Sequence, residues 1–458
     1  MSGMASRRKL AAVMSRTSSY KRRRCTRLSP ERTYLTPGTT NVAAPRRLRL
    51  AQAPGVWAKI SRLSFGGCTR QITAMPCLIL RLAAGLILTG VHAAHATTSM
   101  QLADNARAPI PLQVSTPPHP WRARLLWVFD MMDTASGGRA HGWKAPALIE
   151  LRLTQHQRLQ AGIDSRWHVD LIRILGSNPS SDAGDVQVLD NLSAHHTWRV
   201  YRAFWQLGNA RRHWALRLGW QGYDESFGLV PDGGDLLNSS FGQMPTGSQA
   251  GMPIWPQTAL GISARWHPGA LYVLTGLWSG VPRDPGLPQG WNLPRRGDGS
   301  LRALELGLQR HDRYKLAVGG WTLQRAYTAT QAHHGIYALA DARLLALGTR
   351  GHLVGFLQWG QTQPWHSAVG RYVGAGLRWI SPMHGRVSVG IARAALSPAF
   401  RARHRGSARA ETAYELTWRY RLNPHLALQP DLQYIVHPAL APQATHALEI
   451  GLRIDGSF

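Results

Sequence analysis

Apolar and polar residues alternate along three consecutive segments at the C-terminal end of the chain, at about 413–422, 426–436 and 446–458. In the last segment one face carries Ile450 and is apolar, whereas the other carries Arg453 and is charged. Successive side chains of a strand point to opposite faces, so this period of two predicts β-strands. These segments are longer than the roughly 5–6 residues of an average soluble strand and match the roughly 9–11 residues of a tilted membrane strand.

The same alternation recurs more loosely at 214–220, 260–266, 304–308 and 387–391. No stretch of about 18 apolar residues follows residue 96, so a membrane span there would have to be made of strands. About sixteen strands of roughly ten residues fit into 136–458 with their turns. The pattern therefore predicts an all-β fold, a transmembrane antiparallel β-barrel of about sixteen strands.

A secreted β-sandwich is the alternative, because its strands also carry polar residues on one face. Two features favour the barrel. The polar face is charged while the other face consists of Leu, Ile, Trp and Tyr, and the chain ends on an aromatic residue, Phe458. A terminal aromatic residue resembles the signal by which the assembly machinery of outer-membrane barrels recognises the last strand.

The region before this alternation contains a targeting signal. From Met75 the chain has an apolar run at 82–91 and then the small-x-small ending Ala94-His95-Ala96. These are the parts of a secretory signal peptide, which we assign to 75–96 with cleavage after Ala96. The apolar run is too short to span a bilayer, which takes roughly 20 helical residues. We therefore expect an exported protein in the outer membrane of a Gram-negative bacterium, in contact with its lipid.

Two segments flank this signal. Residues 1–74 are rich in arginine, and we interpret them as a mis-assigned upstream extension or a disordered basic segment. Such a segment would ordinarily indicate nucleic-acid binding, but the cleavable signal directly downstream argues against a nucleic-acid partner. Residues 97–135, with five prolines in 97–120, are expected to be a linker and N-terminal segment ahead of the barrel at 136–458.

Charge and cysteine usage change once residues 1–96 are set aside. That segment holds 17 of the 53 lysines and arginines and one of the 24 acidic residues, which leaves a formal charge of about +13 (36 − 23). All three cysteines also lie before the expected cleavage point. The exported part therefore needs no oxidation to fold, and cysteine nucleophiles and cysteine metal sites are excluded.

Several motifs resemble the carbohydrate-selective outer-membrane porins of the OprB family. The most specific are the signature Asn238-Ser239-Ser240-Phe241-Gly242 and the blocks 411–416, 428–435 and 451–453. The resemblance spans about 136–458 and implies a sixteen-stranded pore through which sugars diffuse passively. One departure is that the loops look short, which puts sugar selectivity in doubt more than porin identity.

The pattern of the last three strands sets their register. If the apolar residues of neighbouring strands share the outer face, the turn between 422 and 426 has three residues, Asn423-Pro424-His425. A bulge at Pro430 would shift the pairings beyond it. The register then predicts two lumen rows, Arg419–Gln429–Arg453 and, nearer the outside, Glu415–Gln433–Glu449.

These rows, together with Asp431 and Arg217, are the candidate pore-lining residues. Inward polar groups supply hydrogen-bond partners for a sugar, and inward aromatic rings supply a stacking face. We expect Arg419 and Arg453 to be hydrated in a water-filled lumen. The alternative is a solvated wall whose charges neutralise one another.

Other constellations are weaker. The pairs His195-His196 and His333-His334 suit a metal poorly, because adjacent residues of a strand point to opposite faces. The segment 224–226 with His213 contains hydrolase residue types, but 97–458 contain no Gly-x-Ser-x-Gly elbow. We therefore predict no enzyme, no cofactor and no metal.

Two further functions stay open beside the sugar porin: a general or anion-favouring porin, and a barrel enzyme or adhesin. Monomer and trimer are both compatible with the sequence.

Overall fold

A computed structural model describes residues 121–159, 162–280, 298–310, 313–325, 332–363 and 367–458, together with Pro294. The expected signal peptide at 75–96 and the arginine-rich segment before it lie outside these residues and stay predictions. Within the described ranges, no helix is long and apolar enough to cross a bilayer.

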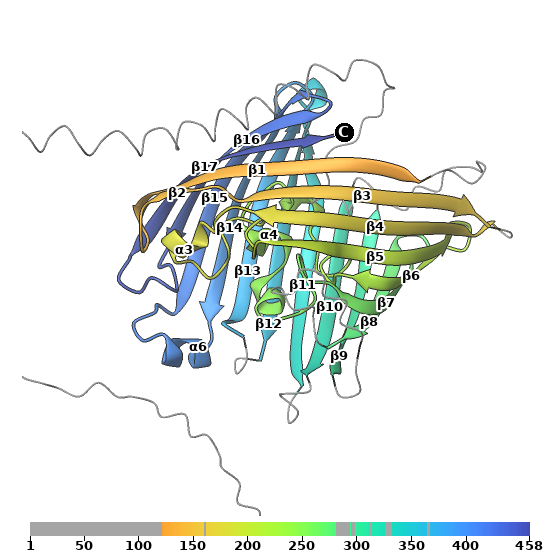
Figure 1. The fold of residues 1–458 in the computed structure, drawn as a ribbon, viewed down its shortest axis with the longest axis horizontal. Coiled ribbons are helices and arrows are strands. Elements are labelled where there is room, and N and C mark those ends of the chain that lie inside the picture. Colours follow the sequence, from red (N-terminus) through yellow and green to blue (C-terminus); the bar gives the residue numbers. More distant parts are fainter. Residues whose placement is uncertain are drawn as a thin grey trace, which may run out of the picture. The chain divides into compact units, whose positions relative to one another are not determined.

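The described strands form one closed antiparallel sheet, because β1 pairs with β17 on one edge and with β2 and β3 on the other (Figure 1). β2 and β3 pair with successive parts of the same edge of β1, so together they count as one strand of the barrel. The predicted sixteen-stranded barrel is therefore confirmed. The strands are β1 (Arg122–Gly137), β2 (Gly142–Lys144), β3 (Ala147–Arg158), β4 (Asp164–Leu175), β5 (Thr197–Asn209), β6 (Trp214–Gln221), β7 (Ala259–Trp266), β8 (Leu271–Ser279), β9 (Gly299–Arg310), β10 (Tyr314–Arg325), β11 (His333–Ala346), β12 (His352–Thr362), β13 (Val369–Ser381), β14 (Gly385–Leu396), β15 (Ala410–Asn423), β16 (Leu426–Val436) and β17 (His446–Ser457).

Short helical segments occur in the connections between strands. They are α3 (Ser180–Ala183), η3 (Pro231–Gly233), α4 (Ser239–Gly242), α5 (Pro245–Ser248), η5 (Gly348–Arg350) and α6 (Pro398–Arg403).

The barrel begins earlier than the sequence predicts. β1 starts at Arg122, inside the segment 97–135 that was expected to be a linker, so that boundary is wrong. In β1 the inward-facing Leu126 and Val128 are apolar and buried, because they pack inside the barrel. Apolar residues on both faces of the strand remove the alternation by which the other strands are recognised.

The two ends of the barrel differ in their connections. One end carries the two chain ends of the sheet and short turns such as that between β15 and β16. The other end carries the long connections, including 176–196 between β4 and β5 and 222–258 between β6 and β7. The expectation of short loops is therefore wrong. In outer-membrane barrels, short turns face the periplasm and longer loops face outward.

The outer face of the barrel is apolar, as predicted. On β15, Tyr414, Leu416 and Trp418 are each more than two-fifths exposed, whereas Glu415 and Thr417 between them are buried. The alternation in the sequence therefore places the charged face inward.

The predicted register of the last three strands is confirmed, although its turn is different. Glu415 pairs with Gln433, and Gln433 pairs with Glu449. Asn423 pairs with Leu426, so the turn has two residues and not three. A bulge between Arg421 and Asn423 shifts the pairing by one residue. This shift was expected to come from a third turn residue.

Pro430 causes no shift in register. It pairs with Leu452 within an uninterrupted ladder between β16 and β17.

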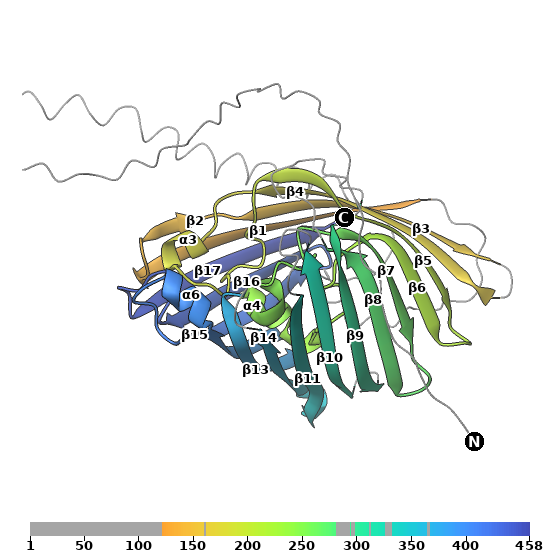
Figure 2. The same ribbon diagram turned by 90° about the horizontal axis from the view of Figure 1, so that it is seen from below.

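Two long connections fold into the barrel, and we call residues 176–196 the first inner loop and residues 222–258 the second inner loop. In both views, α4 of the second inner loop lies between the β1–β5 side and the β11–β15 side of the barrel (Figures 1 and 2). The loop packs Tyr223, Phe227 and Phe241 against inward side chains of the strands, including Trp278 and Phe356. Part of the lumen is therefore a packed apolar core and not an open polar channel.

Candidate functional site

The second inner loop is fixed to the wall first by a buried carboxylate on β9. Glu305 accepts a hydrogen bond from the Gly228 backbone N–H at 2.8 Å. It also accepts from the hydroxyls of Tyr272 and Tyr337, each at 2.7 Å, and lies 3.5 Å from the Lys315 ammonium. Three hydrogen bonds and a nearby ammonium group satisfy the charge that burial would otherwise penalise.

A second attachment uses acids of the loop and cations of the wall. The Asp232 backbone N–H donates to Asp341 at 2.7 Å, and the Asp232 carboxylate pairs with Arg378. Asp235 pairs with Arg378 at 3.1 Å and with Arg386 at 2.6 Å. Burial alone would raise the pKa of Asp235, but the two guanidinium groups hold it well below its usual range.

The third attachment involves the family signature. Glu415 on β15 accepts hydrogen bonds from the backbone N–H groups of Leu237 and Asn238, the latter at 3.0 Å. Asn238 caps α4, because its Oδ1 accepts from the Ser240 N–H at 3.1 Å, and its amide donates to Gln433 at 3.3 Å. Glu415 and Gln433 therefore bind the second inner loop. They do not line a free passage.

The rest of the signature packs in the same way. Ser240 and Phe241 are buried, and the Phe241 ring meets Phe356 edge-on at 6.0 Å. The Ser239 backbone N–H donates to the first inner loop, whereas Gly242 is exposed. The signature therefore shapes the second inner loop.

The first inner loop is held by a second acid of β15. Glu411 accepts the backbone N–H groups of Val186 at 2.9 Å and Gln187 at 3.1 Å. It also accepts the N–H of Ala439 at 2.7 Å. One carboxylate thus joins the loop to the β16–β17 connection.

Arg453 also holds the first inner loop. It donates to Asp130 at 2.7 and 2.8 Å, to Asn191 at 2.8 Å and to Asp190 at 3.4 Å, and it is 7% exposed. The expectation that Arg453 is hydrated is therefore wrong, because the folded-in loop covers it. Burial, together with the neighbouring Asp130, raises the pKa of Asp190 well above its usual range.

The remaining residues predicted from the C-terminal strands are either bonded or buried. Gln429 donates to a backbone carbonyl of the second inner loop at 2.5 Å, and Gln433 donates to Asp431 at 2.9 Å. Glu449 is fully buried, and Arg419 pairs with Asp455 near the short-turn end at 2.8 Å. The inward direction of these side chains was predictable, but the loops that cover them were not.

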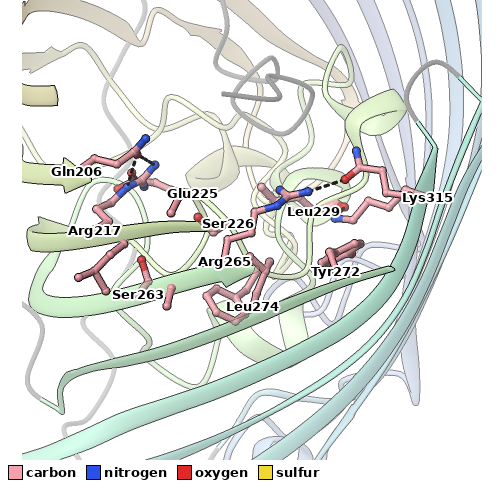
Figure 3. A pocket seen from close by; sticks show the side chains of 15 residues that line it. Gln206, Arg217, Glu225, Ser226, Leu229, Ser263, Arg265, Tyr272, Leu274 and Lys315 are labelled. Atoms are coloured by element: carbon pink, nitrogen blue, oxygen red, sulfur yellow. Dashed lines mark hydrogen bonds and ion pairs between the residues drawn. The ribbon is translucent and has the colours of Figure 1, made fainter. Parts of the chain in front are cut away.

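The opposite part of the wall leaves a cavity of about 100 Å³ between the second inner loop and strands β5–β10 (Figure 3). Arg217 lies at one side of it and donates to Glu225 at 3.0 Å and to Gln206 at 3.3 Å. The cavity is lined by Gln206, Ala215, Leu216, Arg217, Glu225, Ser226, Phe227, Leu229, Ser263, Ala264, Arg265, Tyr272, Leu274, Gln309 and Lys315.

Arg265 lies at the other side of the cavity. Its Nη2 donates to Gln309 at 2.8 Å, and its guanidinium lies 5.0 Å from the centre of the Tyr272 ring. Lys315 donates to the Leu229 carbonyl at 2.8 Å. Donors, an amide and an aromatic ring thus converge on one small space, as Figure 3 shows.

A buried charge network adjoins this space on β3–β5. Arg202 pairs with Asp170, lies 3.5 Å from Glu150 and reaches Glu225 of the second inner loop at 3.7 Å. Arg152 pairs with Glu150 at 2.8 Å. The network fixes Glu225, which in turn orients Arg217.

Of the lining residues, the sequence pointed to Arg217. Arg265 could have been found in the same way, because it alternates with Ile262, Ala264 and Trp266 on β7. Glu225 was considered only as a hydrolase residue, and no periodicity indicates that it folds into the lumen.

The weaker constellations do not assemble. His213 lies in the turn after β5, whereas Ser226 lies in the second inner loop. His333 is buried and His334 is exposed, so the two rings face opposite sides, as expected. The described part of the chain contains no group of three or more His, Cys, Asp or Glu side chains placed to hold a metal.

Residues 167–329 and 308–458 match the family model described as carbohydrate-selective porin, OprB family. The high-pH structure of Pseudomonas putida OprB is 18% identical, with a TM-score of 0.64 over 74% of this chain and 94% of that chain. The low-pH structure of the same protein is 16% identical with a TM-score of 0.46, over 74% and 92%. A triple mutant of the Rhodopseudomonas blastica porin is 11% identical with a TM-score of 0.43, over 73% and 100%. No curated protein matches the chain.

Proposed function

The chain belongs to the OprB family of carbohydrate-selective porins, and on this premise we propose that it conducts neutral sugars passively across the bacterial outer membrane. The observation that supports this function best is the cavity shared by Arg217, Arg265, Gln309 and Tyr272. The two inner loops occupy much of the rest of the lumen.

A sugar crossing this space exchanges water for the lining groups. Arginine donors and glutamine amides can hydrogen-bond hydroxyl groups, and the Tyr272 ring offers an apolar face beside them. The cavity has a volume of only about 100 Å³. A passing hexose therefore has to contact the lining, and transport involves no covalent step.

One observation favours an anion preference as a second property. Arg217, Arg265 and Lys315 line the cavity, whereas Glu225 is its only acidic lining residue among those described. Arg265 donates to an uncharged amide, so its positive charge is not neutralised by a direct partner. Fixed positive charge in a narrow lumen of low dielectric constant attracts anions.

Liposome swelling tests the proposed function. Vesicles that contain the purified barrel should swell in isotonic glucose or maltose at rates well above those of empty vesicles. Gluconate of matched osmolarity tests the anion preference. Sugar swelling equal to that of empty vesicles would overturn the proposal, and slow glucose entry beside fast entry of small anions would favour the anion channel.

A further inference from the structure

The outward face of β9 carries an arginine beside a row of exposed leucines. Arg302 is exposed and points away from the lumen, in line with Leu304 and Leu306, which are 48% and 43% exposed. It lies three residues after the start of β9, at the end of the barrel with the long connections. A lipid-facing arginine costs about 2–4 kcal/mol at the bilayer midplane and about 0–1 kcal/mol near the interface, so this position implies a headgroup environment.

Hydrogen-bonding residues continue from Arg302 around the outside of the barrel. Arg302 pairs with Thr322 on β10, and Thr322 pairs with His334 on β11. The Thr322 hydroxyl and the His334 ring nitrogen Nδ1 are 3.0 Å apart. A cation, a hydroxyl and an imidazole therefore lie side by side on the lipid-facing surface.

A hollow of about 590 Å³ adjoins this row over β6–β10. On the side away from the long connections, the hollow is lined by the small outward residues Ala264, Thr275 and Gly320. Leu216 and Leu304 lie next to them. Arg302 and Thr322 line the side nearer the long connections. The hollow thus combines an apolar surface with a cationic rim.

Other outward arginines lie at the same end of the barrel. Arg371 and Arg393 are exposed on β13 and β14, and Arg173 lies over the Trp198 ring at 5.3 Å. An acid on this face, Asp133, lies on β1, on the opposite side of the closed sheet from β9. The band around Arg302 is therefore complementary to negative charge.

From this charge and shape we propose that the hollow binds one phosphorylated lipid of the outer leaflet. The phosphate would lie at Arg302, Thr322 and His334, and an acyl chain would fill the hollow beside Gly320. Guanidinium and phosphate form strong charge-assisted hydrogen bonds. The inference rests on the outer-membrane location proposed above, but not on sugar transport.

Native mass spectrometry of the full-length barrel in detergent tests this site with two probes, bisphosphorylated hexa-acyl lipid A and the same glycolipid without phosphates. Arg302→Gln should weaken binding of the phosphorylated probe about fivefold. Arg310→Gln is the matched control, because Arg310 is exposed on the same face at the other end of β9. It should leave binding unchanged.

A second variant probes the hollow itself. A Cβ at Gly320 meets no atom closer than 3.4 Å, so Gly320→Leu can be accommodated. The leucine should fill the hollow and weaken the binding of both lipid probes. Equal affinity of Arg302→Gln and Arg310→Gln for phosphorylated lipid A, or equally tight binding of the dephosphorylated probe to the unmodified barrel, would overturn the proposal. A change of subunit number in Gly320→Leu would identify the hollow as a contact between copies and would also overturn it. These lipid-binding measurements do not depend on sugar transport, so they can be interpreted even if sugar does not swell the vesicles.

Discussion

Single residues decide how much of the lumen stays open. The Tyr272 ring lies flat against the wall because the facing residue on β9 is Gly307, where a Cβ would come within 2.4 Å of the ring. Held in this way, the Tyr272 hydroxyl reaches Glu305, and the ring borders the cavity beside Arg265. The glycine therefore positions an aromatic wall that is available for stacking.

Gly307→Ala should push the Tyr272 ring into the lumen and strain its bond to Glu305. Crowding of this kind costs about 1–3 kcal/mol, so the midpoint of urea unfolding should fall. Gly370→Ala is the control, because its Cβ would meet nothing within 4 Å. Equal midpoints for the two variants would show that the Tyr272 contact is not tight.

At the scale of elements, the two inner loops are attached by carboxylates that project from the strands. Glu305, Asp341 and Glu415 each accept a backbone N–H of the second inner loop, and Glu411 does the same for the first. Each of these carboxyl groups satisfies buried backbone N–H groups, and a buried N–H without an acceptor costs about 1–3 kcal/mol. Inward acids therefore act as anchors.

Glu415→Gln should loosen the second inner loop. The carboxyl group offers one oxygen to each of two backbone N–H groups, whereas the amide has only one oxygen. Each poorly satisfied buried group costs about 1–3 kcal/mol. Single-channel conductance in a planar bilayer should rise and become noisier. Arg421→Gln, at the exposed turn end of the same strand, should conduct like the unmodified barrel. Unchanged conductance in Glu415→Gln would mean that the other anchors suffice.

Docking of the first inner loop should depend on pH. Burial raises the pKa of Asp185 to about 6, and the wall carboxyl groups of Glu411 and Glu449 lie close enough to interact with it. The docked loop binds this proton more tightly than the released loop. Docking is therefore strongest below about pH 4 and weakens by roughly 3 kcal/mol as the pH rises through about 6.

Hydrogen exchange of the 186–189 amides, corrected for intrinsic rates, measures this dependence. Protection should fall between about pH 4 and 6, and Asp185→Asn should flatten the decline. The same slope in both proteins would assign the effect to Glu411 and Glu449.

For the whole molecule, the sequence predicted the outer surface well and the interior poorly. Alternation requires only that one face of each strand meets lipid, which is why the faces and register of β15–β17 could be predicted. The inner loops have no such period, because their packing depends on contacts with strands distant in sequence, such as that between Phe241 and Phe356. Glu415 and Arg453 were therefore predicted as inward but not as buried.

Phe458 helps to close the barrel, in addition to its proposed role as an assembly signal. Its backbone exchanges two hydrogen bonds with Leu125 of β1, at 2.9 and 3.0 Å, and its ring stacks on His425 at 5.8 Å. Deletion of Phe458 should lower the heat-modifiable folded fraction in membranes while export continues, and Phe458→Tyr should restore it. An unchanged folded fraction after deletion would show that neither the seam nor the assembly signal depends on this residue.

On the proposed function, sugars pass the cavity beside Arg265 and not the covered wall of β15–β17. Block of the ion current by glucose in planar bilayers tests it most directly, with Arg265→Ala compared against Arg419→Ala, whose guanidinium pairs with Asp455. Arg265→Ala loses donors to sugar hydroxyls, so glucose block should weaken about tenfold, which corresponds to about 1.4 kcal/mol of binding free energy. Arg419→Ala should leave the block unchanged. Block that persists in Arg265→Ala but is lost in Arg419→Ala would place the sugar path along the wall of β15–β17 instead.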